Sequence, residues 1–210
     1  MSGPLEAPLA ELLSVAREDT ARLRALVEDL LDLSRIQRGR VQLALEELPA
    51  AALLEEVVAG ARAAAQAGQI KLEVDFSTPE LRIIADPPRL RLALGNLVQN
   101  AIRHAPAGTE VYCRVRSSGS AARFEVDDAG PGVRPEDRAR IFEPFVRGED
   151  EAPGGAGLGL SIAAEIVAAH GGSIGVGEAE LGGARFWIEL PAANALTIRA
   201  EASAEVSARP

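Results

Sequence analysis

Residues able to do chemistry gather in a few stretches of this chain, and the first is rich in glycine. Gly155, Gly157 and Gly159 alternate with small or apolar residues, among them Leu158 and Leu160, and an apolar helical pattern follows directly. Glycine lets a backbone approach a ligand closely, and the unpaired N–H groups of a helix start attract anions. The stretch lacks Gly-Lys-Ser/Thr and no strand precedes it, so it is neither a P-loop nor a Rossmann turn. Plain packing explains such a helix start equally well.

A second stretch carries polar residues at helical spacing. Asn96, Asn100 and Arg103 stand at i, i+4 and i+7, which places them on one face of a helix. Asparagine oxygens suit Mg²⁺, and an arginine one turn further along can pair with phosphate. A solvated polar helix face is the alternative.

A third stretch follows a predicted strand and reads Asp127-Asp128-Ala-Gly130-Pro-Gly132. A buried carboxylate of Asp128 would accept the exocyclic amine of adenine and reject guanine, which has an oxygen at that place. The two glycines would give the base room. The same residues also make an ordinary turn.

Two aromatic residues, Phe142 and Phe145, precede an acidic, glycine-rich loop over 148–156. We expect this loop to be a mobile lid that the aromatics anchor and a terminal phosphate orders. Arg147 stands where it would reach that phosphate, or else is an ordinary surface arginine.

Alternating helical and strand patterns surround these stretches. Helices are expected over 49–68, 86–104 and 158–170, with a shorter one over 134–142, and strands over 41–45, 70–76, 81–85, 111–115, 124–127, 173–176 and 184–190. This mixture predicts an α+β sandwich with helices on one face of a sheet. Before it, a heptad pattern over 9–37 predicts a rod of roughly 45 Å that needs a partner helix, or else a helix packed on its own domain.

Composition narrows the class of protein. The chain has 210 residues, 47% hydrophobic and 25% charged, as in ordinary globular proteins. A net charge of -9 disfavours nucleic acid as a partner. One cysteine rules out a disulfide framework, and no apolar run approaches membrane-spanning length, so we expect a cytoplasmic location. The alternative is the cytoplasmic part of a larger membrane-anchored protein.

Together the motifs resemble those of the sensor histidine kinases. Asn96-Leu-Val-Gln-Asn100-Ala101 is similar to their N box, and residues 142–145 are similar to their F box. Residues 128–132 are similar to their first glycine box and residues 155–160 to their second. Residues 182–186 are similar to the segment that closes the domain. Residues 26–43 resemble the second helix of the family's dimerisation domain. That flank distinguishes the chain from gyrase B-type ATPases, chaperone ATPases and anti-sigma serine kinases. The resemblance implies the Bergerat-type ATP-binding fold of the GHKL superfamily.

The resemblance also implies roles. Asn100 would coordinate Mg²⁺ beside ATP, Asp128 would read adenine, and the remaining contacts with the nucleotide would come from Asn96, Arg103, His104, Gly130, Gly132, Phe145, Gly155, Gly157, Leu158, Gly159 and Leu160. Asn100, Arg103 and Arg147 would act in catalysis. The implied reaction moves the γ-phosphoryl group of ATP to a histidine and then to a response regulator receiver domain. A phosphoacceptor helix or second subunit would be the other partner, in a homodimer.

The chain departs from the family in its histidines. It has two, His104 and His170, and neither is followed by the acidic residue and proline expected after an acceptor. We therefore expect the acceptor elsewhere, and His170 near the carbonyls that end its helix. The expected division is a leader or expression remnant (1–8), a partial dimerisation helix and linker strand (9–45), an ATP-binding kinase domain (46–191) and a disordered tail (192–210). An ATP-binding switch module and an anti-sigma-type serine kinase are the alternatives.

Overall fold

The computed structural model describes residues 13, 20, 42–76, 78–146, 157–180 and 182–193. The expected lid over 148–156 lies outside these residues, as does the expected rod over 9–37 apart from residues 13 and 20. The tail expected from 192 is described only at 192–193, where Ala192 forms a β-bridge with Ile83 and is 4% exposed. The expectation of a disordered tail is therefore wrong at residue 192, because that residue extends the pairing of the last strand.

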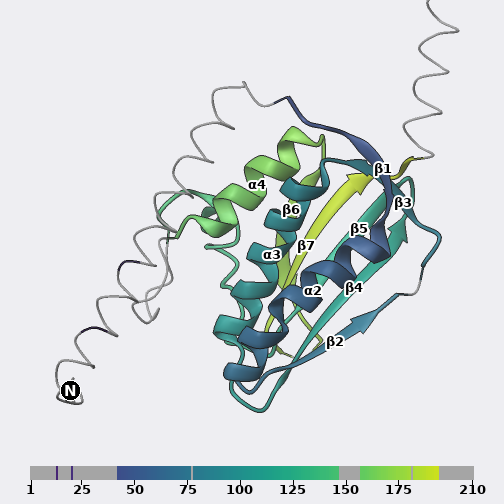
Figure 1. The fold of residues 1–210 in the computed structure, drawn as a ribbon. Coiled ribbons are helices and arrows are strands. Elements are labelled where there is room, and N and C mark those ends of the chain that lie inside the picture. The colour runs from purple at the N-terminus through teal and green to yellow at the C-terminus, as the bar shows by residue number, and fades with distance from the viewer. Residues whose placement is uncertain are drawn as a thin grey trace, which may run out of the picture.

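Three helices cover one face of a five-stranded sheet (Figure 1). The sheet order is β2-β4-β5-β7-β6, in which β2 and β4 are parallel and the other pairs antiparallel. The elements are β1 (Glu46–Pro49), α2 (Ala50–Ala67), β2 (Lys71–Asp75), β3 (Arg82–Ala85), α3 (Pro87–His104), β4 (Glu110–Ser118), β5 (Ala121–Asp127), a 3₁₀ turn (Arg140–Phe142), α4 (Gly159–Ala169), β6 (Ser173–Glu178) and β7 (Ala184–Pro191). This two-layer arrangement confirms the α+β sandwich.

Alternation along β5 separates the two faces of the sheet. Phe124 and Val126 point toward the helices and are fully buried, whereas Arg123, Glu125 and Asp127 lie on the other face. Apolar side chains of the three helices form the core with them, including Leu53, Leu54, Leu90, Leu94, Leu97, Ile162 and Ile166. Ala169, the last residue of α4, is exposed.

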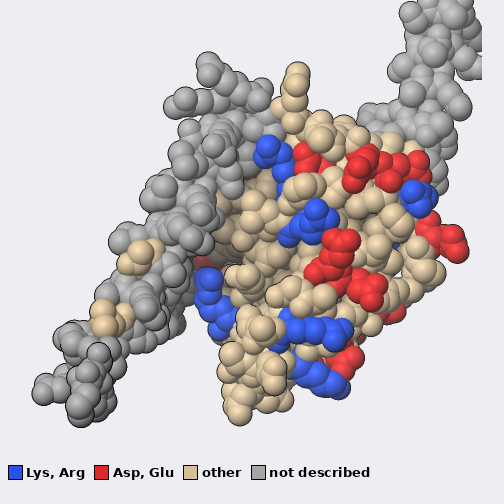
Figure 2. Space-filling view, viewed as in Figure 1, with Lys and Arg blue, Asp and Glu red and all other residues tan. Residues whose placement is uncertain are grey.

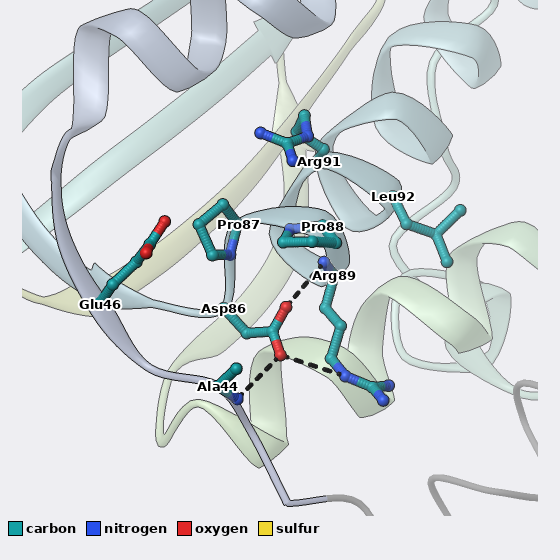
Figure 3. Close-up of a pocket in the computed structure, with 8 residues that line it drawn as sticks. All are labelled: Ala44, Glu46, Asp86, Pro87, Pro88, Arg89, Arg91 and Leu92. Carbon is teal, nitrogen blue, oxygen red and sulfur yellow. Dashed lines mark hydrogen bonds and ion pairs between the residues drawn. The ribbon is translucent and has the colours of Figure 1, made fainter.

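The start of α3 is fixed by Asp86, as its capping pattern predicts. One carboxylate oxygen accepts from the N–H of Arg89 at 3.2 Å, and the other accepts from the N–H of Ala44 at 3.0 Å (Figure 3). The N–H of Asp86 donates to Nε2 of His170 at 2.9 Å. Because Nδ1 of that ring meets the carbonyl of Ile166 at 2.7 Å, His170 joins the end of α4 to the start of α3.

Two expected elements differ in the structure. The first strand is Glu46–Pro49 rather than 41–45, because pairing with β3 sets its limits and matches Glu46 with Ala85. The helix expected over 134–142 is reduced to the turn Arg140–Phe142. Isolated turns near Arg134 and Pro135 replace its first part.

The sheet face away from the helices carries a network of charges around Glu125. This side chain is buried, 1% exposed, and forms ion pairs with Arg114, Arg116 and Arg123. Although burial opposes ionisation, hydrogen bonds from Arg116 and Arg123 and the nearby positive charges lower the pKa of Glu125 to about 2. Its folded-state pKa lies below the usual value of 4.5, so it contributes stability above pH 4.5 that is lost as the pH falls toward 2.

We predict that Glu125→Gln is less stable than the wild type at neutral pH by about 2–3 kcal/mol, because three arginines lose a buried counter-charge. The difference should shrink between pH 4.5 and 2, where the wild type loses the same contribution. Urea unfolding at several pH values measures it. Glu178→Gln, at a side chain 85% exposed, is the control and should follow the wild type. A constant difference across the acid range would contradict the role of Glu125.

Candidate functional site

Asp128 directly follows β5, and within the described residues only one oxygen of its carboxylate is hydrogen-bonded. The residue is 2% exposed, and its Oδ1 accepts from the N–H groups of Gly130 at 2.8 Å and Ala184 at 3.2 Å. Its Oδ2 is buried and has no hydrogen-bond partner among the described residues. Burial raises the pKa of Asp128, although the N–H groups of Gly130 and Ala184 oppose this. A buried acceptor without a donor is costly, so this oxygen is suited to a ligand that brings one.

Glycines leave the space around this carboxylate. A Cβ at Gly130 would lie 2.8 Å from the carbonyl oxygen of His104 and 2.9 Å from Oδ1 of Asp128. A Cβ at Gly183 would lie 2.2 Å from the carbonyl oxygen of Asp128. Gly132 acts differently, since its φ of +74° suits glycine while a Cβ would meet only ordinary contacts. Sequence reasoning gave Gly183 no role, and its only signal was its place in the 182–186 motif.

The end of α3 faces the Asp128 turn. The carbonyl of His104 borders Gly130, so the last turn of the helix lies directly beside it. Asn100 stands one turn earlier and is half-buried, whereas Arg103 is exposed. The structure thus brings Asn100, His104 and Asp128 to the same end of the molecule.

Asn96 joins α3 to the glycine-led start of α4. Its Nδ2 donates to the carbonyl of Gly159 at 2.9 Å, so this amide holds the two helices together. Leu158, the N-cap residue of α4, makes no side-chain capping hydrogen bond, so among the described residues the first N–H groups of this helix are suited to an anion. The Leu158 side chain is buried in the core and Leu160 is half-buried against it, so both side chains pack inside the domain.

Phe145 and Gly157 bracket the segment 147–156, which contains Arg147 and Gly155 and lies outside the described residues. The N–H of Phe145 donates to the carbonyl of Gly157 at 3.0 Å, and both residues have positive φ, +65° and +68°. Phe142 is partly buried against the core, but Phe145 is 63% exposed. The expectation that both aromatic rings anchor this segment is therefore wrong for Phe145, whose backbone makes the attachment.

A groove of about 680 Å³ lies at the opposite end of α3 (Figure 3). Asp86, at its base, is engaged with Ala44 and Arg89, and Arg91 pairs with Glu56. Pro87 and Pro88 have no N–H to offer a ligand. Asn100 is about 21 Å further along the helix at 1.5 Å per residue, so this groove is separate from the site around Asp128.

Charges of both signs mix on the helix-bearing face of the described part of the molecule (Figure 2). Within that part, no group of three or more His, Cys, Asp or Glu side chains could hold a metal ion. No described helix is long and apolar enough to cross a membrane.

Known proteins match this chain and its fold. Residues 85–194 match the family of histidine kinase-, DNA gyrase B- and HSP90-like ATPases. The alginate biosynthesis sensor protein KinB of Pseudomonas aeruginosa is 34% identical over 90% of this chain. The match covers 31% of KinB, so the chain spans about a third of the length of that relative.

Solved structures of histidine kinases show the same arrangement. Full-length ShkA in complex with AMPPNP has a TM-score of 0.78 and 37% identity, over 90% of this chain and 40% of that one. ThkA in complex with the response regulator TrrA has a TM-score of 0.72 and 26% identity, over 91% of this chain and 53% of that one. The chain therefore belongs to the histidine kinase-, DNA gyrase B- and HSP90-like ATPase family, and its ATP-binding domain is of the sensor histidine kinase type.

Proposed function

We propose that this chain binds ATP with its adenine amine on Oδ2 of Asp128. The observation that carries the proposal is the buried oxygen without a partner, next to an oxygen that two backbone N–H groups hold in place. An amine donor satisfies this acceptor, whereas the oxygen of guanine would face it with a second acceptor. The uncapped start of α4, at Gly157 and Gly159, is then the place for the phosphates.

Asn100 would hold Mg²⁺ together with the phosphates of the nucleotide. An amide oxygen is a hard ligand, and Mg²⁺ in nucleotide sites takes one or two protein ligands besides phosphates and water. The ion would neutralise part of the negative charge of the phosphates. The chain's own residues position the site: Asn96 fixes the start of α4 against α3, and His104 borders the base end.

The phosphoryl acceptor in this proposal is a histidine on another segment or subunit, within a phosphorelay that continues to a response regulator. His170 has both ring nitrogens engaged, with Ile166 and with the N–H of Asp86. His104 belongs to the nucleotide-binding helix itself. The ThkA–TrrA complex supports a response regulator as the later acceptor.

We expect the chain to bind ATP more tightly than GTP, and Asp128→Asn to lose at least about fivefold in ATP affinity, since an unpaired buried group costs about 1–3 kcal/mol. Titration calorimetry with both nucleotides measures this. Asp137→Asn makes the same chemical change at a surface turn and should match the wild type. Equal affinity for ATP and GTP in the wild type would contradict the adenine-reading role.

Because burial raises the pKa of Asp128, its carboxylate takes up a proton at a higher pH than an ordinary aspartate. ATP affinity should therefore fall on acidification, starting above the ordinary titration range of aspartate. Calorimetry between pH 4 and 8 tests this, with Asp128→Asn as the comparison that lacks the titrating group. An equally steep pH dependence in both proteins would assign the effect to another group.

We predict that the chain alone does not phosphorylate its own histidines, because both ring nitrogens of His170 are engaged and His104 belongs to the nucleotide-binding helix of the proposal. Incubation with γ-labelled ATP, alone and with an added acceptor-helix domain, should label only the added domain. The label should be acid-labile, as phosphohistidine is, whereas an anti-sigma-type serine kinase would leave acid-stable label. Acid-labile label on the chain alone that disappears in His104→Gln or His170→Gln would overturn the prediction.

A further inference from the structure

An ion pair lies directly behind Asp128, on the opposite face of the sheet. Arg185 donates to both oxygens of Asp127, at 2.8 Å from Nε and 2.7 Å from Nη2. Arg114 also donates to Asp127, and Arg185 donates to Glu180 at 3.2 Å. The Asp127 side chain is 4% exposed and that of Arg185 is 19% exposed. A forked arginine–carboxylate pair with this burial fixes geometry as well as charge.

This pair and the Asp128 anchor occupy the same step of the sheet. Asp127 of β5 stands opposite Arg185 of β7 in the strand register. One residue further along β5, the N–H of Asp128 donates to the carbonyl of Ala184 at 2.9 Å, and Oδ1 of Asp128 accepts from the N–H of Ala184 at 3.2 Å. Because side chains alternate between faces, the ion pair and the Asp128 carboxylate act on the two sides of one strand junction.

The junction is the place where both strands end. β5 finishes at Asp127, and β7 begins at Ala184 directly after Gly182 and Gly183. Strand ends separate most easily, and two glycines add no side-chain contacts to hold them. Gly183 cannot gain a side chain, because its Cβ would lie 2.2 Å from the carbonyl oxygen of Asp128. The forked contact on the far face therefore adds a second restraint to the contact between Asp128 and Ala184 on the near face.

We propose that Asp127 and Arg185 are positioning residues for adenine recognition. By holding β5 against β7, they keep the N–H of Ala184 on Oδ1 of Asp128, and this leaves Oδ2 aimed at the base. The inference rests on the proposed ATP-binding function of Asp128. It assigns a role in nucleotide selection to residues on the face of the sheet opposite the Asp128 carboxylate.

The test compares Arg185→Gln and Arg185→Lys with a matched control, Glu189→Gln. The control breaks the Arg123–Glu189 pair, 2.8 Å long, which joins the same two strands on the same face four register steps away. One readout needs no nucleotide: amide hydrogen exchange at Ala184 in the free protein. The other is the ratio of ATP to GTP affinity from calorimetry.

Arg185→Gln should exchange the Ala184 amide faster and lose about tenfold in ATP affinity with little change for GTP, so the ratio falls. Arg185→Lys keeps the charge but not the fork, and should lie between it and the wild type. Glu189→Gln should match the wild type in both readouts. If Arg185→Gln does not fold, Arg185→Lys carries the comparison alone.

The inference is overturned if Ala184 exchange and the affinity ratio are unchanged in the Arg185 variants, or if Glu189→Gln changes both as much. The second result would mean that the pair contributes only general sheet stability. A wild type that binds ATP and GTP equally would instead contradict the proposed function. In that case the exchange of Ala184 still decides whether Arg185 holds the junction.

Discussion

The constraint on which this domain depends is the buried carboxylate of Asp128. Its Oδ1 accepts two hydrogen bonds, whereas its Oδ2 has no hydrogen-bond partner among the described residues. Burying a carboxylate is unfavourable, as its raised pKa shows. The sheet offsets part of that cost with two backbone N–H groups on Oδ1. The remaining cost, at Oδ2, is offset only when a donor arrives. In the function proposed above, the exocyclic amine of adenine would be that donor.

The helix α3 connects the Asp128 turn with the start and the end of α4. Its start is held by Asp86, which binds both the incoming chain at Ala44 and the ring of His170. Its last turns carry Asn100 and His104 to the Asp128 turn. Midway, Asn96 holds the start of α4. The two helices therefore contact each other at both ends of α4, so its uncapped N-terminus is fixed relative to the acceptor.

The charged face of the sheet complements the apolar layer beneath the helices. Glu125 and Asp127 are buried there because arginines from β4, β5 and β7 surround them. Arg123 also lies over the ring of Trp187, 4.3 Å from its centroid. These contacts join three strands on the face that no described helix covers. Arginine–carboxylate pairs have a preferred geometry, so they fix the relative position of the strands more specifically than hydrophobic burial does.

The order and types of most elements followed from the sequence, because apolar periodicity and local capping chemistry carry that information. Asp86 with Pro87 marked the start of α3, and alternation marked β5 and β7. The candidate residues Asn100, Asp128 and Gly157 were recognisable from residue type and spacing. Local signals failed where a partner sets the limits: β1 lies at Glu46–Pro49 because β3 pairs with it there. Only the tertiary structure decided that Asn96 holds α4, that His170 reaches Asp86, that Gly183 makes room for Asp128 and that Arg185 lies behind it. Each of these contacts joins residues more than 50 positions apart, and no local pattern encodes which distant backbone will meet a given side chain.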